Sequence, residues 1–289
     1  MEMAIKSAKA AMFMYCDKDE DNDTEFDNYK DEGGQSYADF EQYNPEQFGW
    51  KEVPAEFAES IAEKSEVEYQ KYVMLNEDGS VYAEHNYFYD KSTGFKAGLY
   101  ETPDGDYVLV SRGTHNSEEI PSKRDWIDDN IKQGLFGRSD QYDQEARVSA
   151  AIREKINMEN EANGTNSKFI TAGHSLGGGT ATLGAAVGRA DESYVFNAAG
   201  VNNRMFDRHE STRADAAHVY SFSSDYDPLT MLNDNVWLAP GTAGKRIVLE
   251  VESTSIIKIG KWLTNGHDLP YLLKAMKAVP VAKVYALKQ

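Results

Sequence analysis

The stretch TAGHSLGGGT, residues 171–180, constrains the fold more than any other part of the sequence. The apolar stretch KFITAG precedes Ser175, and the small-residue stretch GGTATLGAAVGRA follows it. A serine with glycines two residues before and after it, between a strand and a helix, is typical of a sharp turn that exposes a nucleophilic hydroxyl. The alternative is a glycine-rich turn that only joins a strand to a helix. The remainder of the sequence has to decide between these two interpretations.

The residue types around Ser175 fit the chemical interpretation. A nucleophile in such a turn sits in a strained backbone conformation, and the residues two positions away lie where strand and helix nearly touch. Gly173 and Gly177 remove the side chains that would collide there, and small residues such as Gly184 let the helix pack close to the sheet. Nucleotide binding fits worse, because there is no G-x-G-x-x-G and no lysine follows for a Walker A loop.

From Phe95 onward, strands alternate with helices along the sequence. Continuous apolar strands are typical of a sheet that is buried on both faces, and alternation with helices implies right-handed crossovers. We therefore expect an α/β fold with a mostly parallel central sheet flanked by helices. The expected strands are 95–102, 107–113, 168–173, 193–199, 218–224 and 246–253, and the expected helices are 122–133, 141–158, 178–190 and 269–279.

The sequence predicts one domain over residues 1–289, since neither an internal repeat nor a Pro/Ser-rich linker divides it. Residues 1–16 predict a helix, because their apolar stretch is too short for a secretory signal. The acidic segment at about 17–60 is expected to pack on or beside the domain. Cys16 is the single cysteine, so the fold is expected to depend on its core rather than on disulfides.

The net charge of −18 argues against nucleic acid as a partner. The charge is uneven: residues 241–289 carry +5, which leaves −23 on residues 1–240. We interpret the basic end as a lysine-coated terminal helix. The sequence contains no run of about 18 apolar residues, so it predicts no transmembrane segment.

A calcium loop is the one metal site that the acidic segment suggests. Asp17, Asp19 and Asp21 match the first ligands of such a loop, but Asn22 replaces its turn glycine and Asn28 its bidentate glutamate. We therefore expect no metal and no cofactor.

A nucleophilic serine needs a base, and a base needs an orienting acid; where a serine lies in such a turn, the chain order is serine, acid, histidine. Among six histidines, His267 alone follows residue 218, on a loop just before a predicted helix. Asp225 and Asp227 both follow a predicted strand, and either suits a turn. The dipeptide Asp227-Pro228 forms a rigid turn that can aim a carboxylate at the histidine.

These residues carry a resemblance to class 3 lipases over roughly residues 85–280. YVLVSRGTHNSEEIPSKRDWIDDNI resembles the Arg-Gly-Thr/Ser and Asp-Trp region of that family, GHSLGGG its nucleophile turn, and Asp227-Pro228-Leu229 its acid loop. DWIDDNIKQGLFG and YVFNAAG are also similar to a bacterial branch that includes phospholipase A1-like enzymes. The resemblance implies an α/β-hydrolase fold, a triad of Ser175, Asp227 and His267, and oxyanion-hole N–H groups from Thr114 and Leu176.

The expected function is hydrolysis of carboxylic esters of acyl lipids or small esters, by a triacylglycerol lipase or carboxylesterase. Phospholipase A1 is the alternative, a feruloyl-type esterase a weaker one, and a non-catalytic lipid-binding fold the competing class. Trp126 and Ile127 are candidates for a lid or substrate wall, although the polar stretch after Thr114 argues against strong interfacial activation. Residues 256–260, IIKIG, suit either a lipid-facing element or a buried strand. Secretion suits a lipase, and the sequence leaves the oligomeric state open.

Overall fold

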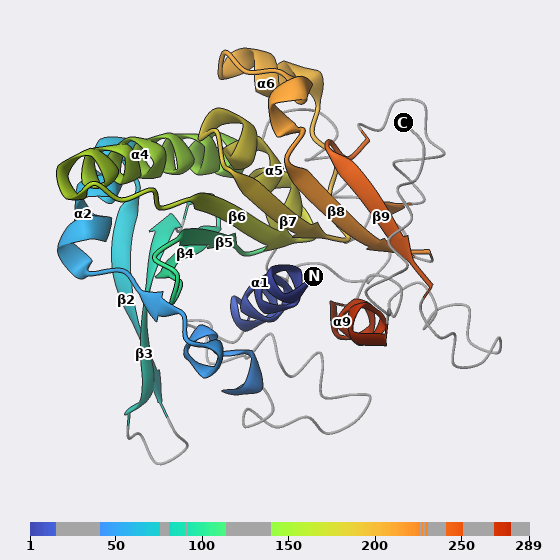
Figure 1. Ribbon diagram of the computed structural model, residues 1–289, viewed down its shortest axis with the longest axis horizontal. Coiled ribbons are helices and arrows are strands. Elements are labelled where there is room, and N and C mark those ends of the chain that lie inside the picture. Colours follow the sequence, from blue (N-terminus) through green and yellow to red (C-terminus); the bar gives the residue numbers. More distant parts are fainter. Residues whose placement is uncertain are drawn as a thin grey trace.

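The computed structural model describes residues 1–15, 41–75, 81–90, 92–113, 140–225, 227, 229–230, 241–250 and 269–278. Within them one sheet runs through the molecule in the order β2-β3-β4-β5-β6-β7-β8-β9, with β1 paired to β4 (Figure 1). The strands are β1 (Lys51–Glu52), β2 (Glu68–Leu75), β3 (Val81–Asp90), β4 (Phe95–Glu101), β5 (Tyr107–Ser111), β6 (Phe169–His174), β7 (Glu192–Phe196), β8 (Val219–Ser224) and β9 (Lys245–Leu249).

The sheet has an antiparallel half and a parallel half. Strands β1 to β5 pair antiparallel, and β4 and β5 are joined by a turn in which Gly105 N donates to Thr102 O (2.9 Å). Strands β5 to β9 pair parallel, each next to the strand that follows it in the sequence. The carboxyl ends of these parallel strands meet at one edge of the sheet, which is where ligands bind in open α/β sheets.

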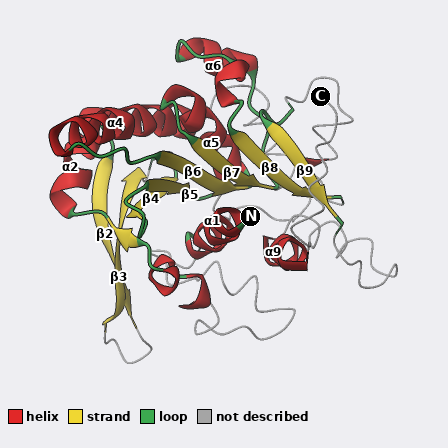
Figure 2. Ribbon diagram, viewed as in Figure 1, coloured by secondary structure: helices red, strands yellow, loops and turns green. Residues whose placement is uncertain are grey.

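Helices cover both faces of the sheet (Figure 2). Helices α1 (Glu2–Phe13) and α9 (Leu269–Ala278) lie on one face, and α2 (Ala55–Ser65), α4 (Asp140–Asn163) and α5 (Leu176–Val187) lie on the other (Figure 1). The remaining described elements are α6 (Asn203–Arg208) and the 3-10 turns η4 (Glu41–Tyr43), η5 (Pro45–Phe48) and η6 (Arg213–Ala216).

The two hydrophobic cores follow from the alternation of side chains along the strands. In β5, Val108 and Val110 belong to the core beneath α1 and α9, whereas Leu109 belongs to the core beneath α2, α4 and α5. In β6, Ile170 belongs to the core beneath α1 and α9, and Phe169 belongs to the core beneath α2, α4 and α5. A strand buried on both faces carries apolar residues on each face instead of alternating apolar and polar ones, which explains why the sequence shows mostly apolar runs here. The α/β-hydrolase architecture expected from the sequence is confirmed.

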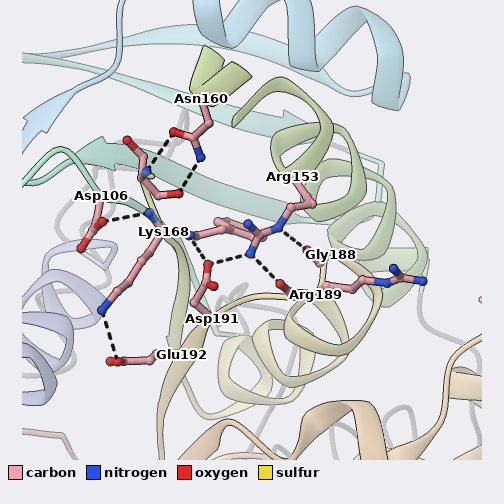
Figure 3. Close-up of polar contacts among 10 residues, drawn as sticks. Asp106, Arg153, Asn160, Lys168, Gly188, Arg189, Asp191 and Glu192 are labelled. Atoms are coloured by element: carbon pink, nitrogen blue, oxygen red, sulfur yellow. Dashed lines mark hydrogen bonds and ion pairs between the residues drawn. The ribbon is translucent and has the colours of Figure 1, made fainter. Parts of the chain in front are cut away.

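A polar network ties the loops at the amino ends of β6 and β7 (Figure 3). Asp191 Oδ2 accepts hydrogen bonds from Phe169 N and from Arg153 Nη2, both at 2.8 Å. Arg153 also donates to the carbonyl oxygens of Gly188 (3.1 Å) and Arg189 (2.5 Å), and Lys168 N donates to the Asp106 carboxylate (2.9 Å). Burial alone would raise the pKa of Asp191, but the bonds from Arg153 and Phe169 outweigh it and lower that pKa.

The described elements agree with the sequence prediction over most of the parallel half. Helix α4 is longer than the predicted 141–158, and β9 begins one residue earlier than predicted. Strands β2 and β3 and helix α2 lie in residues 51–90, for which no element was predicted. The predicted helix at 122–133 and the stretch IIKIG at 256–260 lie outside the described residues.

The acidic segment predicted at about 17–60 is described only from residue 41 onward. In that described part, Trp50, Val53 and Phe57 are buried in the two cores. The candidate calcium ligands lie outside the described residues. No described helix is long and apolar enough to cross a bilayer.

Candidate active site

Ser175 occupies a strained turn between β6 and α5. Its backbone has φ +57° and ψ −126°, a conformation that residues other than glycine rarely adopt. Such strain costs about 1–3 kcal/mol and persists only where the surroundings impose it. Here Ser175 N donates to Phe196 O (3.0 Å), and Ser175 O accepts from Ala199 N (2.9 Å), so the last residue of β7 and the segment just after it hold both sides of the turn.

Gly173 and Gly177 leave no room for a side chain. A Cβ at Gly173 would lie 2.5 Å from the carbonyl carbon of Gly177, across the gap between strand and helix. A Cβ at Gly177 would lie 2.6 Å from the carbonyl carbon of Arg112, just beyond β5. Neither glycine has a positive φ, so space rather than backbone conformation requires them.

Among the other small residues of α5, Gly184 makes a different contact from the one predicted. Gly184 faces α4 rather than the sheet: a Cβ there would lie 2.5 Å from Ser149 Oγ and 2.9 Å from Glu145. The sheet contact is made about one turn earlier in the same helix, where Thr171 Oγ1 of β6 donates to Ala181 O (3.0 Å). Helix α5, which follows Ser175, is therefore packed tightly against both β6 and α4.

The structure distinguishes the two candidate acids, Asp227 and Asp225. Asp227 is fully buried, and its Oδ2 accepts hydrogen bonds from Thr230 N (2.8 Å) and Thr230 Oγ1 (2.5 Å). Asp225 is only partly buried, and its N–H extends the pairing of β8 with β9 by donating to Leu249 O (3.1 Å). A buried, hydrogen-bonded carboxylate is better held for orienting another side chain.

Asn197, which the sequence analysis did not single out, connects the turn at Ser175 to the strand that leads to Asp227. It follows β7 with φ +42°, and its Oδ1 accepts a hydrogen bond from Ser224 N (2.9 Å). Its own N–H donates to Phe222 O (2.8 Å). Asparagine tolerates the left-handed region better than most residues, and this tolerance is the one sequence signal that marks the position.

Tyr15 is a second residue that the sequence analysis missed. It follows α1, which contacts β5, β6 and β7 (Figure 1). Its hydroxyl oxygen accepts a hydrogen bond from Gly113 N (3.1 Å) and lies 3.1 Å from His174 Nδ1. The two rings also meet edge to face, with centroids 5.8 Å apart. The residue that follows α1 thus joins the second residue after β5 to the residue before Ser175.

Four described histidines have positions that do not suit a base for Ser175. His85 Nδ1 is 3.0 Å from Glu52 Oε1, and His209 Nε2 is 2.8 Å from Asp143 Oδ1. His174 Nδ1 lies 3.1 Å from the Tyr15 hydroxyl, and exposed His218 lies at the amino end of β8, the opposite edge of the sheet.

Of the candidate site residues, the structure describes Gly173, Ser175, Leu176, Gly177 and Asp227. Ser175 directly follows β6 and Asp227 follows β8, so both lie at the carboxyl edge of the parallel strands. Leu176 is the first residue of α5, where N–H groups have no partner within the helix. Thr114, Trp126, Ile127 and His267 lie outside the described residues.

Comparison with known proteins gives a family match over most of the chain. A model of the Tle-like phospholipase domain matches residues 36–266. An extracellular phospholipase A1 from Serratia liquefaciens is 31% identical over 185 residues, which is 62% of this chain and 52% of the relative. The chain thus spans about half the length of that curated relative.

Solved structures of fungal proteins are similar at low sequence identity. A mutant form of MDLA from Penicillium cyclopium is 15% identical, with a TM-score of 0.49, over 89% of this chain and 83% of that one. A non-glycosylated lipase from Yarrowia lipolytica is 13% identical, with a TM-score of 0.46, over 86% of this chain and 79% of that one.

Proposed function

The chain belongs to the Tle-like phospholipase family, and from this membership we propose that it hydrolyses carboxylic ester bonds of acyl lipids, with glycerophospholipids as the preferred substrates. The family description and the Serratia relative both favour phospholipids over triacylglycerols. Triacylglycerol hydrolysis is the second candidate, because the motifs around Ser175 and Asp227 resemble those of class 3 lipases. Secretion, which is stated for the Serratia relative, is a proposal for this chain.

The observation that carries the proposal is the backbone conformation of Ser175. A buried strand, a serine at φ +57° and a tightly packed helix form the turn that presents a serine hydroxyl for nucleophilic attack. The strain is supported by hydrogen bonds to Phe196 and Ala199, and a turn that only joined two elements would not need it.

In the proposed mechanism, Ser175 Oγ attacks the ester carbonyl while His267 takes the hydroxyl proton. The tetrahedral intermediate collapses to an acyl-serine, and the same proton passes from His267 to the departing alcohol. Water then attacks the acyl-serine with His267 again as the base, which releases the fatty acid and restores Ser175. Asp227 orients the imidazole and stabilises its protonated form.

The oxyanion of each tetrahedral intermediate needs hydrogen-bond donors. We assign them to the N–H groups of Leu176, at the amino end of α5, and of Thr114, with the Thr114 hydroxyl assisting. The helix macrodipole favours negative charge at the amino end of α5, which supports the assignment of Leu176.

The proposal is tested with purified full-length chain on three substrates in one buffer. These are mixed-chain phosphatidylcholine vesicles, a triacylglycerol emulsion and a p-nitrophenyl ester. We expect fatty acid release from all three, fastest from phosphatidylcholine, and labelling of Ser175 by a fluorophosphonate that adds the mass of one phosphonyl group.

Ser175→Ala is the matched control, and it should remove both turnover and labelling. The mass of the released acid shows which acyl position is cleaved. Rapid hydrolysis of triacylglycerol with little on phosphatidylcholine would support the second candidate. A wild-type chain that neither turns over an ester nor reacts with the fluorophosphonate would contradict the enzymatic proposal and favour a non-catalytic lipid-binding role.

A further inference from the structure

Glu145 is a buried acid that the proposed mechanism does not use. It lies on α4 with no exposed surface, and its side chain points at the end of β5. There Ser111 Oγ donates a hydrogen bond to Glu145 Oε2 (2.7 Å), and both groups are buried. Ser111 is the last residue of β5, three residues before Thr114 in the chain.

The Glu145 side chain lies where three elements meet. Besides Ser111 of β5, it approaches α5, since a Cβ at Gly184 would lie 2.9 Å from its Oε1. The chain at the end of β5 packs directly against the turn at Ser175, because a Cβ at Gly177 would lie 2.6 Å from the carbonyl carbon of Arg112. The Glu145–Ser111 hydrogen bond is therefore placed to set how the end of β5 lies against the nucleophile turn.

This arrangement is costly for the fold. Among the residues that the structure describes, Glu145 Oε1 is buried without a hydrogen-bond partner. An unsatisfied buried polar atom costs free energy that an apolar side chain of similar volume would not. Burial raises the pKa of Glu145 to about 7. The hydrogen bond from Ser111 acts in the opposite direction, but its effect is smaller. Packing alone would be served better by leucine, so the contact with Ser111 is what distinguishes glutamate here.

We propose that Glu145 is a positioning residue for ester hydrolysis, which acts through Ser111 by holding the end of β5 against the turn that carries Ser175. This inference rests on the proposed function. Displacement of a site by 1 Å or less weakens stabilisation of the transition state much more than binding of the substrate. Loss of the hydrogen bond should therefore lower kcat and leave KM nearly unchanged.

The test compares variants that remove the hydrogen bond with one that keeps it. Ser111→Ala and Glu145→Leu are each expected to lower kcat on a p-nitrophenyl ester by about tenfold to a hundredfold, with KM close to wild type. Glu145→Gln retains an oxygen that accepts from Ser111, and it should keep most of the wild-type kcat. The double variant Ser111→Ala/Glu145→Leu should lose little more than either single variant, because both remove one contact.

Ser149→Ala is the matched control. Ser149 lies one turn further along α4 and faces the same Gly184, so its removal should leave kcat unchanged. Thermal unfolding checks that each variant is folded at the assay temperature. If Glu145 served packing alone, Glu145→Leu would be as stable as wild type and equally active.

Folded Ser111→Ala and Glu145→Leu proteins with wild-type kcat would overturn the inference, as would a Glu145→Gln protein as slow as Glu145→Leu. If Glu145→Leu does not fold, Ser111→Ala decides alone. In each of these cases the wild type is active and its Ser175 reacts with a fluorophosphonate. Failure of the proposed function would instead remove activity and labelling from the wild type itself.

Discussion

At the scale of single residues, the candidate site depends on side chains that the fold holds under strain or without solvent. Ser175 keeps a positive φ, and Asn197 keeps another immediately after the neighbouring strand. Asp227 is buried and hydrogen-bonded, whereas Asp225 continues the pairing of a strand. These differences lead to a prediction about which acid acts on His267.

Asp227→Asn should lower kcat by roughly 10³–10⁴, because an amide at this position favours the wrong histidine tautomer. Asp225→Asn is the matched control, since it makes the same change two residues away. It should leave kcat near wild type, and initial rates on a p-nitrophenyl ester measure both. A large loss in Asp225→Asn with little loss in Asp227→Asn would reverse the assignment of the acid.

At the scale of elements, the sheet edge that carries Ser175 is braced by helices on both faces. Helix α5 packs on α4 through Gly184, and α1 reaches the opposite side of the turn through Tyr15. The family match begins at residue 36, so α1 lies outside it and still contacts the residues beside Ser175. The N-terminal helix is therefore part of the structure on which the proposed site depends.

Tyr15→Phe removes the hydroxyl group that accepts the Gly113 N–H. The ring remains, but a buried N–H without a partner costs about 1–3 kcal/mol and lets the chain after β5 shift. We expect kcat to fall with little change in KM, together with a lower melting temperature. Tyr107→Phe is the control, because Tyr107 lies at the amino end of β5 and stacks on Phe57. Equal kcat values for the two variants would contradict a role of α1 in the site.

At the scale of the whole molecule, the two edges of the sheet carry different groups of polar residues. The carboxyl edge carries Ser175 and Asp227, and the amino edge carries the network around Arg153 and Asp191 (Figure 3). Glu145 lies within the helix layer, and its proton couples the stability of the whole fold to pH. The neighbours described above for it, Ser111 of β5, Ser149 of α4 and Gly184 of α5, are uncharged.

The raised pKa of Glu145 predicts a loss of stability as pH rises. The unfolded chain ionises this group near 4.5 and the folded chain near 7, so between these values the folded state holds the extra proton. The contribution is complete below pH 4.5 and is lost by about pH 7, at a cost of about 3 kcal/mol at alkaline pH. Glu145→Gln should therefore flatten the pH dependence of the free energy of unfolding between pH 5 and 8.

Urea unfolding of the wild type and Glu145→Gln across that range measures the difference. Glu161→Gln, at an exposed position of the same helix, is the control for removing a carboxylate. Parallel curves for wild type and Glu145→Gln would show that the carboxyl group does not titrate in this range.

The sequence alone determined the features whose contacts are local. A buried strand, Ser175 and a small-residue helix are consecutive, so glycine spacing and apolar patterning within one turn predict them. The proposed order of nucleophile, acid and base also lies in the sequence. It limits the proposed acid to two aspartates, of which the rigid Asp227-Pro228 turn favours Asp227. Local apolar runs predicted the parallel strands β6 to β8, because each strand contributes apolar residues to the cores on both faces of the sheet.

Only the tertiary structure decided the contacts between residues far apart in the chain. Tyr15 meets His174 across 159 positions, and Ser111 meets Glu145 across 34. Neither contact leaves a periodic trace in the sequence, because each is one hydrogen bond made when separate elements pack together. The difference in burial between Asp227 and Asp225 belongs here too: burial at the end of β8 depends on what packs over it, and no neighbouring residue encodes that.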